Sequence, residues 1–160
     1  MPPTILLALF IGIPLLLAVV LRVKPLYLFV AIVTGYFWVQ FLGSTAELIV
    51  RSMVKSSNSD VVTNIGLLLI PVFFTFLLMR KTLSASSLPF QFVLLLADSL
   101  LLAMFLVPLL SAGTQGAIYQ TEIGSIFKQS HDVAIAAIAA LHLLVMFFMR
   151  PKLHGRRKHK

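Results

Sequence analysis

The chain has 160 residues, of which 59% are hydrophobic and only 11% are charged, and its mean hydropathy is +1.02. A soluble domain carries about 25% charged residues, so this composition excludes a globular protein folded in water. The 13 basic and 5 acidic residues give a formal net charge of +8, and the absence of cysteine excludes disulfides and thiolate metal sites.

The first apolar stretch has no basic residue before it and no small-residue cleavage site after it. This arrangement is typical of an uncleaved first span rather than of a secretory leader. The span ends at the basic turn Arg22-Val23-Lys24-Pro25, because a proline disfavours helix in the residue before it.

Four further apolar stretches follow, each close to the roughly 20 residues that a helix needs to cross a bilayer. A segment in lipid must satisfy its own backbone hydrogen bonds, and the alternation that a barrel requires is missing. We therefore predict an all-α fold, a polytopic transmembrane helical bundle in a single membrane domain over residues 1–152. The predicted spans lie at 4–21, 26–42, 61–79, 89–110 and 133–149.

Two polar segments, 43–60 and 111–132, join these spans on the side away from the basic turns. In the first, Ser44 and Glu47 have the spacing of a capping box, which predicts that a new helix begins at Ser44. Glu47, Arg51 and Lys55 then follow at four-residue steps opposite an apolar face, which favours ion pairing along a short amphipathic helix. This pattern leaves open whether the helix is interfacial, re-entrant or packed over the bundle.

The second polar segment repeats these features, with apolar residues at helical spacing, and predicts a second short extracytoplasmic amphipathic helix. These residues are Tyr119, Ile123, Ile126 and Phe127. Residues 52–61 also align with residues 125–133, given a gap of one residue, and both lead into an apolar span that ends in a basic stop. We therefore predict an internal duplication as a parallel repeat, with chance similarity between apolar segments as the alternative.

Each predicted repeat has an aspartate before its second span, Asp60 in the first copy and Asp132 in the second. Both are predicted to cap a helix N-terminus, where a carboxylate also interacts favourably with the helix dipole. Their expected role is therefore structural.

Asp98 and His142 are the two ionisable residues that fall inside predicted spans. A rise of 1.5 Å per residue places both roughly 12–14 Å from those ends of their helices that are predicted to be cytoplasmic, so the two side chains can meet at one depth. Intramembrane ionisable residues are costly, and they commonly mark proton or ion pathways. The alternatives are a polar clasp between two helices, or a neutral Asp98 bonded to a backbone carbonyl.

The basic residues that flank the spans all lie on one side of the predicted bundle, and no acidic residue joins them there. They are Arg22, Lys24, Arg80, Lys81, Arg150, Lys152, Arg156, Arg157, Lys158 and Lys160. The positive-inside rule then predicts an integral membrane protein of a bacterial inner (cytoplasmic) membrane, with its N-terminus outside and its C-terminus in the cytoplasm. Charges confined to span ends argue against nucleic acid as a partner. The basic cytoplasmic tail, 153–160, can bind anionic lipid instead.

The sequence contains no nucleotide-binding loop, serine-hydrolase elbow or metalloprotease motif, and its four histidines lack a metal-ligand spacing. We therefore expect no cofactor and no metal, and an enzyme is the least favoured reading. The first hypothesis is a non-enzymatic structural or assembly subunit that associates with copies of itself or with a larger membrane complex. A small transporter or channel that uses Asp98 and His142 is the alternative.

Over residues 1–130 the layout is similar to that of the bacterial colicin V production family: a short chain, several spans and outer amphipathic helices. The likeness is one of architecture. The basic turn at Arg22–Pro25 departs from the glycine–basic–glycine character of that family, and the fifth span is an addition. The resemblance implies a membrane protein of that kind as a second alternative.

Overall fold

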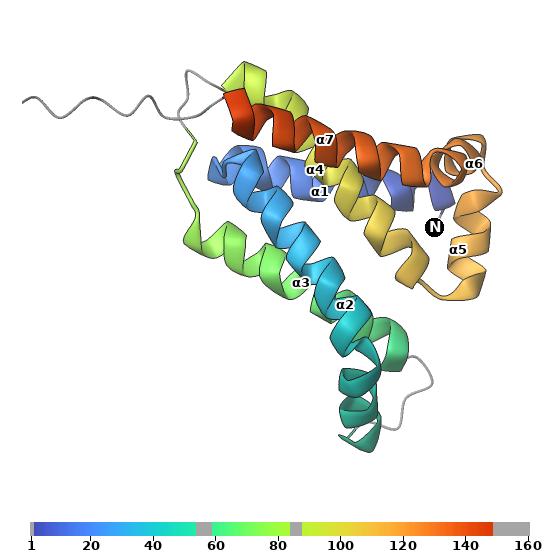
Figure 1. Cartoon of the computed structure of the whole chain (residues 1–160). Helices are drawn as coiled ribbons and strands as arrows, with labels where there is room; N and C mark the ends of the chain where they lie inside the picture. The colour runs from blue at the N-terminus through green and yellow to red at the C-terminus, as the bar shows by residue number, and fades with distance from the viewer. Residues whose placement is uncertain (1, 54–58, 84–87, 149–160) are drawn as a thin grey trace, which may run out of the picture.

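The computed structural model describes residues 2–53, 59–83 and 88–148, and every regular element in these ranges is helical (Figure 1). The helices are α1 (Pro3–Leu21), α2 (Pro25–Met53), α3 (Ser59–Leu78), α4 (Leu88–Leu106), α5 (Ala112–Tyr119), α6 (Glu122–Gln129) and α7 (His131–Phe148), with a 3-10 turn, η2, at Val107–Leu109. The prediction of an all-α helical bundle is thereby confirmed.

Four of the described helices are long and apolar enough to cross a membrane: α1, α2, α3, and α4 together with η2. A fifth crossing segment exists if α6 and α7 are counted together, since the two helices meet at a bend of 65°. The apolar side chains of these helices face outward to a large extent, and Leu16, Phe41 and Leu78 are each more than 60% exposed. Lipid rather than water is the solvent that suits such a surface.

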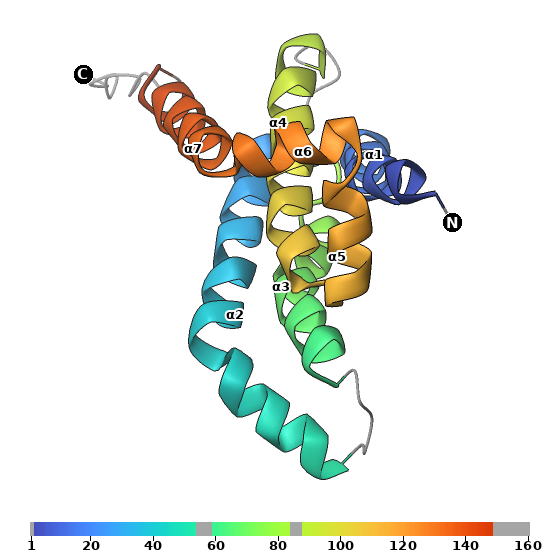
Figure 2. The same cartoon turned by 90° about the vertical axis from the view of Figure 1, so that its right-hand side faces the viewer.

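The ends of the long helices lie in three places (Figures 1 and 2). The turn between α1 and α2, the end of α3 and the end of α7 lie on the left of Figure 1. The N-terminus, α5 and α6 lie on the right, while the far end of α2 and the start of α3 project downward as a separate arm. The predicted basic turns therefore share one end of the molecule.

Helices α2 and α3 approach each other closely because α2 presents small residues to its neighbour. Ala31, Gly35 and Gly43 are all buried, at spacings of four and eight residues along one face. A methyl group at Gly35 would overlap the main-chain carbonyl oxygen of Leu68 and would stand 3.1 Å from the Leu68 Cα. This small-residue spacing is the one that lets two helix backbones pack together in a membrane.

A second buried cluster joins α1 and α4 to the short helices. It contains Leu7, Met104, Val107, Ile118 and Phe127. The short helices α5 and α6 are thus packed over one end of the bundle through Ile118 and Phe127, which are almost fully buried. The sequence left open whether the outer segments are interfacial, re-entrant or packed over the bundle. For the segment that forms α5 and α6, the structure favours packing over the bundle.

The capping box predicted at Ser44 is wrong, because α2 continues without a break from Pro25 to Met53. Gly43 does not end the helix; it packs against α3, with the Asn64 side chain close to it. Ser44 and Glu47 therefore lie in the interior of a helix whose amide groups already have intrahelical partners. The predicted pairing is confirmed for Glu47, whose carboxylate forms an ion pair with Arg51 one turn later, while Lys55 lies outside the described residues.

The second outer segment also differs from its prediction, because it forms two helices and not one. Tyr119 ends α5, while Ile123, Ile126 and Phe127 belong to α6. Thr121 separates the two helices by capping α6, with its hydroxyl accepting a hydrogen bond from the Gly124 amide at 3.0 Å. A threonine in this role is the usual N-cap chemistry, which the sequence reasoning overlooked.

The predicted caps Asp60 and Asp132 lie one residue inside their helices, since α3 begins at Ser59 and α7 at His131. Both carboxylates remain in the first turn, where they still favour the positive end of the helix dipole. The Asp132 carboxylate also contacts the His131 ring, with 2.9 Å between Oδ1 and Nδ1. The duplication itself stays a prediction, and the outer parts of its two copies are built differently.

Candidate functional site

The structure brings Asp98 and His142 together in the interior of the bundle. Asp98 lies on α4 and His142 on α7, and 3.0 Å separates Asp98 Oδ1 from His142 Nε2. Both side chains are almost completely shielded, at 0% and 2% exposure. Two helices whose spans are far apart in sequence are therefore joined by a carboxylate–imidazole contact in an apolar environment.

Three neighbours contact the imidazole and fix its orientation: Asp98, Phe29 and Ile138. The Phe29 ring from α2 stacks on it with ring centroids 4.3 Å apart and planes 9° from parallel. On its own helix, His142 Nδ1 lies 3.0 Å from the carbonyl oxygen of Ile138. A carbonyl can only accept, so Nδ1 carries a hydrogen and Nε2 is the nitrogen turned toward Asp98.

This tautomer limits the proton states of the pair. A neutral His142 leaves Nε2 as an acceptor, which suits a protonated Asp98, whereas a charged His142 suits an ionised Asp98. Each of these two states places one proton at the contact, either on Asp98 or on His142 Nε2. The contact meets the distance for an ion pair, but neither Asp98 oxygen nor Nε2 is aligned for a hydrogen bond.

The chemistry of this pair is narrow. It can hold or pass one proton, or it can join α4 to α7. Ser99, beside Asp98, is also fully buried, but its hydroxyl donates to the Leu95 carbonyl at 2.9 Å and is not free to act on a ligand. In the part of the chain that the structure describes, no three His, Asp or Glu side chains come together as a metal site.

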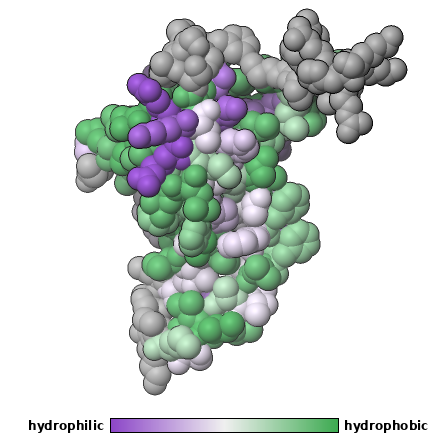
Figure 3. Space-filling view, turned by 90° about the vertical axis from the view of Figure 1, so that its left-hand side faces the viewer, coloured by the Kyte–Doolittle hydropathy of each residue, from purple (hydrophilic) through white to green (hydrophobic). Residues whose placement is uncertain are grey.

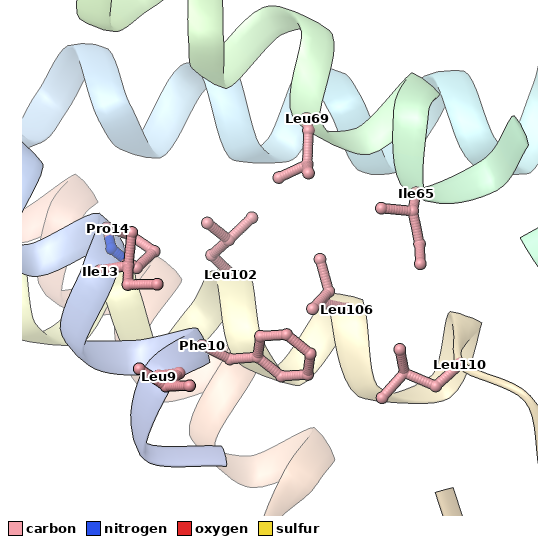
Figure 4. Close-up of a pocket in the computed structure, with 9 residues that line it drawn as sticks. All are labelled: Leu9, Phe10, Ile13, Pro14, Ile65, Leu69, Leu102, Leu106 and Leu110. Atoms are coloured by element: carbon pink, nitrogen blue, oxygen red, sulfur yellow. The ribbon is translucent and has the colours of Figure 1, made fainter. Parts of the chain in front are cut away.

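Two cavities in the described part of the structure do not reach the pair. One has a volume of about 230 Å³ between α1, α3 and α4, and Figure 4 shows only apolar side chains pointing into it. The other, of about 380 Å³, lies between α2, α3 and the end of α7, and includes Thr34 and Thr75. Asp98 and His142 line neither cavity. The geometry of the closed pair therefore favours the clasp over an open ion path.

The predicted basic residues that lie in the described ranges gather at one end of the molecule. Arg22, Lys24, Arg80 and Lys81 are all exposed there. The Lys81 amide donates to the Leu21 carbonyl at 2.9 Å, and the Leu83 amide donates to the Arg22 carbonyl at 2.8 Å. Figure 3 views this side and shows strongly hydrophilic residues gathered in a patch above a mainly apolar face. The basic residues predicted at 150–160 lie outside the described residues.

The sequence reasoning missed three residues that position the site. Phe29 aligns the imidazole, Gly35 sets the distance between α2 and α3, and Thr82 holds the two basic turns together. The spacing of Ala31 and Gly35 was visible as a signal of close helix packing. Phe29 carried no such signal, because sequence does not fix the rotation of one helix relative to another.

Comparison of the chain with protein-family models, with curated proteins and with solved structures finds no match.

Proposed function

We propose that this protein is a non-enzymatic subunit of a membrane assembly, with its basic turns in the cytoplasm of a bacterial inner membrane. The observation that carries the proposal is the length of α2. Its 29 residues extend about 44 Å, whereas the hydrocarbon core is about 30 Å thick. The last third of α2 therefore stands beyond the membrane core as part of an arm.

The arm carries apolar side chains that its own chain leaves uncovered. Leu48, Ile49 and Met53 are 71%, 55% and 79% exposed, while the Glu47–Arg51 pair occupies another side of the same helix. An amphipathic helix in this position packs against headgroups or against another protein chain. We assign the apolar side of this arm as the contact surface of the assembly.

A charge on the apolar side of the arm is expected to weaken assembly. We expect Ile49→Glu and Met53→Glu to reduce cross-linked species in native membranes by about tenfold or more, which corresponds to about 1.4 kcal/mol of lost contact energy. The measurement is chemical cross-linking in intact membranes followed by mass spectrometry. The matched control is Ser44→Glu, which adds the same charge to the exposed side nearest Arg51.

The proposal fails if Ser44→Glu lowers the yield of cross-linked species as much as Ile49→Glu does. It also fails if the unmodified protein forms no cross-links to itself or to another membrane protein. Expression level and membrane insertion are compared in all variants, so that loss of the protein is not mistaken for loss of contact.

A second function, proton-linked or ion-linked transport, is favoured by one observation: two buried ionisable side chains, Asp98 and His142, face each other at 3.0 Å. If the pair is a relay, Asp98→Asn abolishes proton-linked flux in proteoliposomes while the protein remains folded. Under our first proposal the same variant leaves cross-linking unchanged, and the unmodified protein carries no proton current above that of empty vesicles. If the unmodified protein carries a proton flux and Asp98→Asn removes that flux, the protein is a transporter and the subunit proposal is wrong.

A further inference from the structure

The two basic turns at the end of the bundle form one structural unit, although more than fifty residues separate them in sequence. Besides the two main-chain hydrogen bonds from Lys81 and Leu83, the Lys24 amide donates to the Thr82 hydroxyl at 3.1 Å. That hydroxyl in turn donates to the Met79 carbonyl at 2.8 Å. The four cations are therefore mounted on one hydrogen-bonded platform and not on independent loops.

Two of these cations occupy a backbone conformation that their residue type disfavours. Arg22 has φ of 53° and Lys81 has φ of 60°, and they are the two non-glycine residues with positive φ in the described chain. A Cβ atom makes this conformation unfavourable, so glycine is the residue that fits it without cost. Strain of this kind at a non-glycine residue is a recognised mark of a functional position.

The local structure gives Arg22 and Lys81 no alternative reason to be charged. Arg22 follows the last turn of α1, where its amide donates to Val19 and the Val23 amide donates to Ala18, and a glycine would make both bonds. Within the described residues, none of the four cations forms an ion pair with a carboxylate. Lys24 and Arg80, which have no positive φ, would be enough to keep these turns in the cytoplasm by the positive-inside rule.

We propose that the platform of Arg22, Lys24, Arg80 and Lys81 binds the phosphate headgroup of an anionic membrane lipid. The two arginine guanidinium groups and the two lysine ammonium groups are positively charged, and all four can donate hydrogen bonds to phosphate oxygens. Val23 and Leu83, buried at 0% and 3% exposure, anchor the platform to the apolar core, which keeps the cations at the level where headgroups lie. This inference does not depend on the assembly role proposed above.

The decisive variant is the double substitution Arg22→Gly and Lys81→Gly, which removes two charges and relieves the strained backbone. We expect it to bind phosphatidylglycerol at least tenfold more weakly than the unmodified full-length protein, as measured by native mass spectrometry in a neutral detergent. We expect its melting temperature without lipid to be equal or higher. Loss of binding without loss of stability separates a ligand site from a structural one.

A matched control removes two charges from helices that lie away from the platform, Arg51→Gln on α2 together with Lys128→Gln on α6 (Figure 1). The affinity of this control for phosphatidylglycerol should stay within twofold of that of the unmodified protein. Both variants keep the basic C-terminal tail, so lipid binding by the tail contributes equally to both. Phosphatidylcholine and inorganic phosphate serve as separate probes, and neither should compete at the concentration that saturates phosphatidylglycerol.

Three results would overturn the proposal. Equal weakening in the control means that net charge and not the platform attracts lipid. Competition by inorganic phosphate at the same concentration means that a free anion is the ligand. A lower melting temperature in the glycine variant without lipid means that Arg22 and Lys81 are retained for the fold.

Discussion

An alanine at Gly35 is expected to force α2 and α3 apart. The added methyl group would overlap the Leu68 carbonyl, and backbone atoms, unlike the end of a flexible side chain, cannot turn aside. Overpacking of a close-packed interior costs about 1–3 kcal/mol, and the better helix propensity of alanine returns less than about 1 kcal/mol of that. We therefore expect a net loss of stability, and a larger one for Gly35→Leu.

The measurement is reversible unfolding in mixed detergent micelles, followed by far-ultraviolet circular dichroism. The matched control is Gly66→Ala on α3, where the added methyl group would meet no atom within 4 Å. That variant should be as stable as the unmodified protein or slightly more so. If Gly35→Ala and Gly66→Ala have the same free energy of unfolding, the close approach of α2 and α3 is refuted.

Removal of the Asp98 side chain is expected to have the second largest effect. Asp98→Ala leaves His142 Nε2 in an apolar interior without a partner, and an unsatisfied buried polar group costs about 1–3 kcal/mol. Asp98→Asn keeps the shape, and its amide can donate to Nε2, so its cost should be under about 1 kcal/mol. Unfolding in mixed micelles measures both variants.

A double-mutant cycle with His142→Phe tests whether the two side chains act together. Phenylalanine keeps the stacking on Phe29 and removes the polar nitrogen, so in its presence Asp98→Ala should cost less than it does alone. The expected coupling energy is about 0.6–2 kcal/mol, the range for polar contacts between membrane helices. Strictly additive free energies would mean that the 3.0 Å contact contributes nothing to the fold.

The parts of the fold that the sequence predicted best depend on the length of an apolar stretch or on the number of residues along one helix. The fourth span, predicted at 89–110, agrees with α4 and η2 over 88–109, and Pro108 lies in the 3-10 turn that ends it. The shared depth of Asp98 and His142 was also predictable, because Asp98 lies nine residues past Pro89 and His142 lies eight residues before Arg150, at the same end of the bundle. The rise per residue is nearly constant in a helix, so the number of residues from the helix end gives the depth of a side chain in the membrane.

The predictions that failed depended on where a helix stops. The Ser44–Glu47 spacing resembled a helix start, yet α3 packs on the neighbouring Gly43 and the helix continues through this segment. At Thr121 the opposite occurred, and a helix predicted as one piece divides into α5 and α6. Tertiary packing decided the first case, which a local capping motif cannot indicate. In the second case the Thr121 cap is local chemistry that the sequence reasoning overlooked. The stacking of Phe29 on His142 was not predictable either, because it depends on how α2 and α7 are rotated relative to each other.

Single-cysteine labelling tests the central claim, that lipid surrounds helices whose basic turns share one face of the membrane. The natural chain has no cysteine, so each introduced thiol is the sole target of a membrane-impermeant maleimide. In intact cells we expect labelling at Met53→Cys and Ile123→Cys but not at Lys24→Cys or Lys81→Cys, and the reverse pattern in inverted membrane vesicles. Labelling of Lys24→Cys and Lys81→Cys from opposite faces, or of all four positions from one face, would contradict the account.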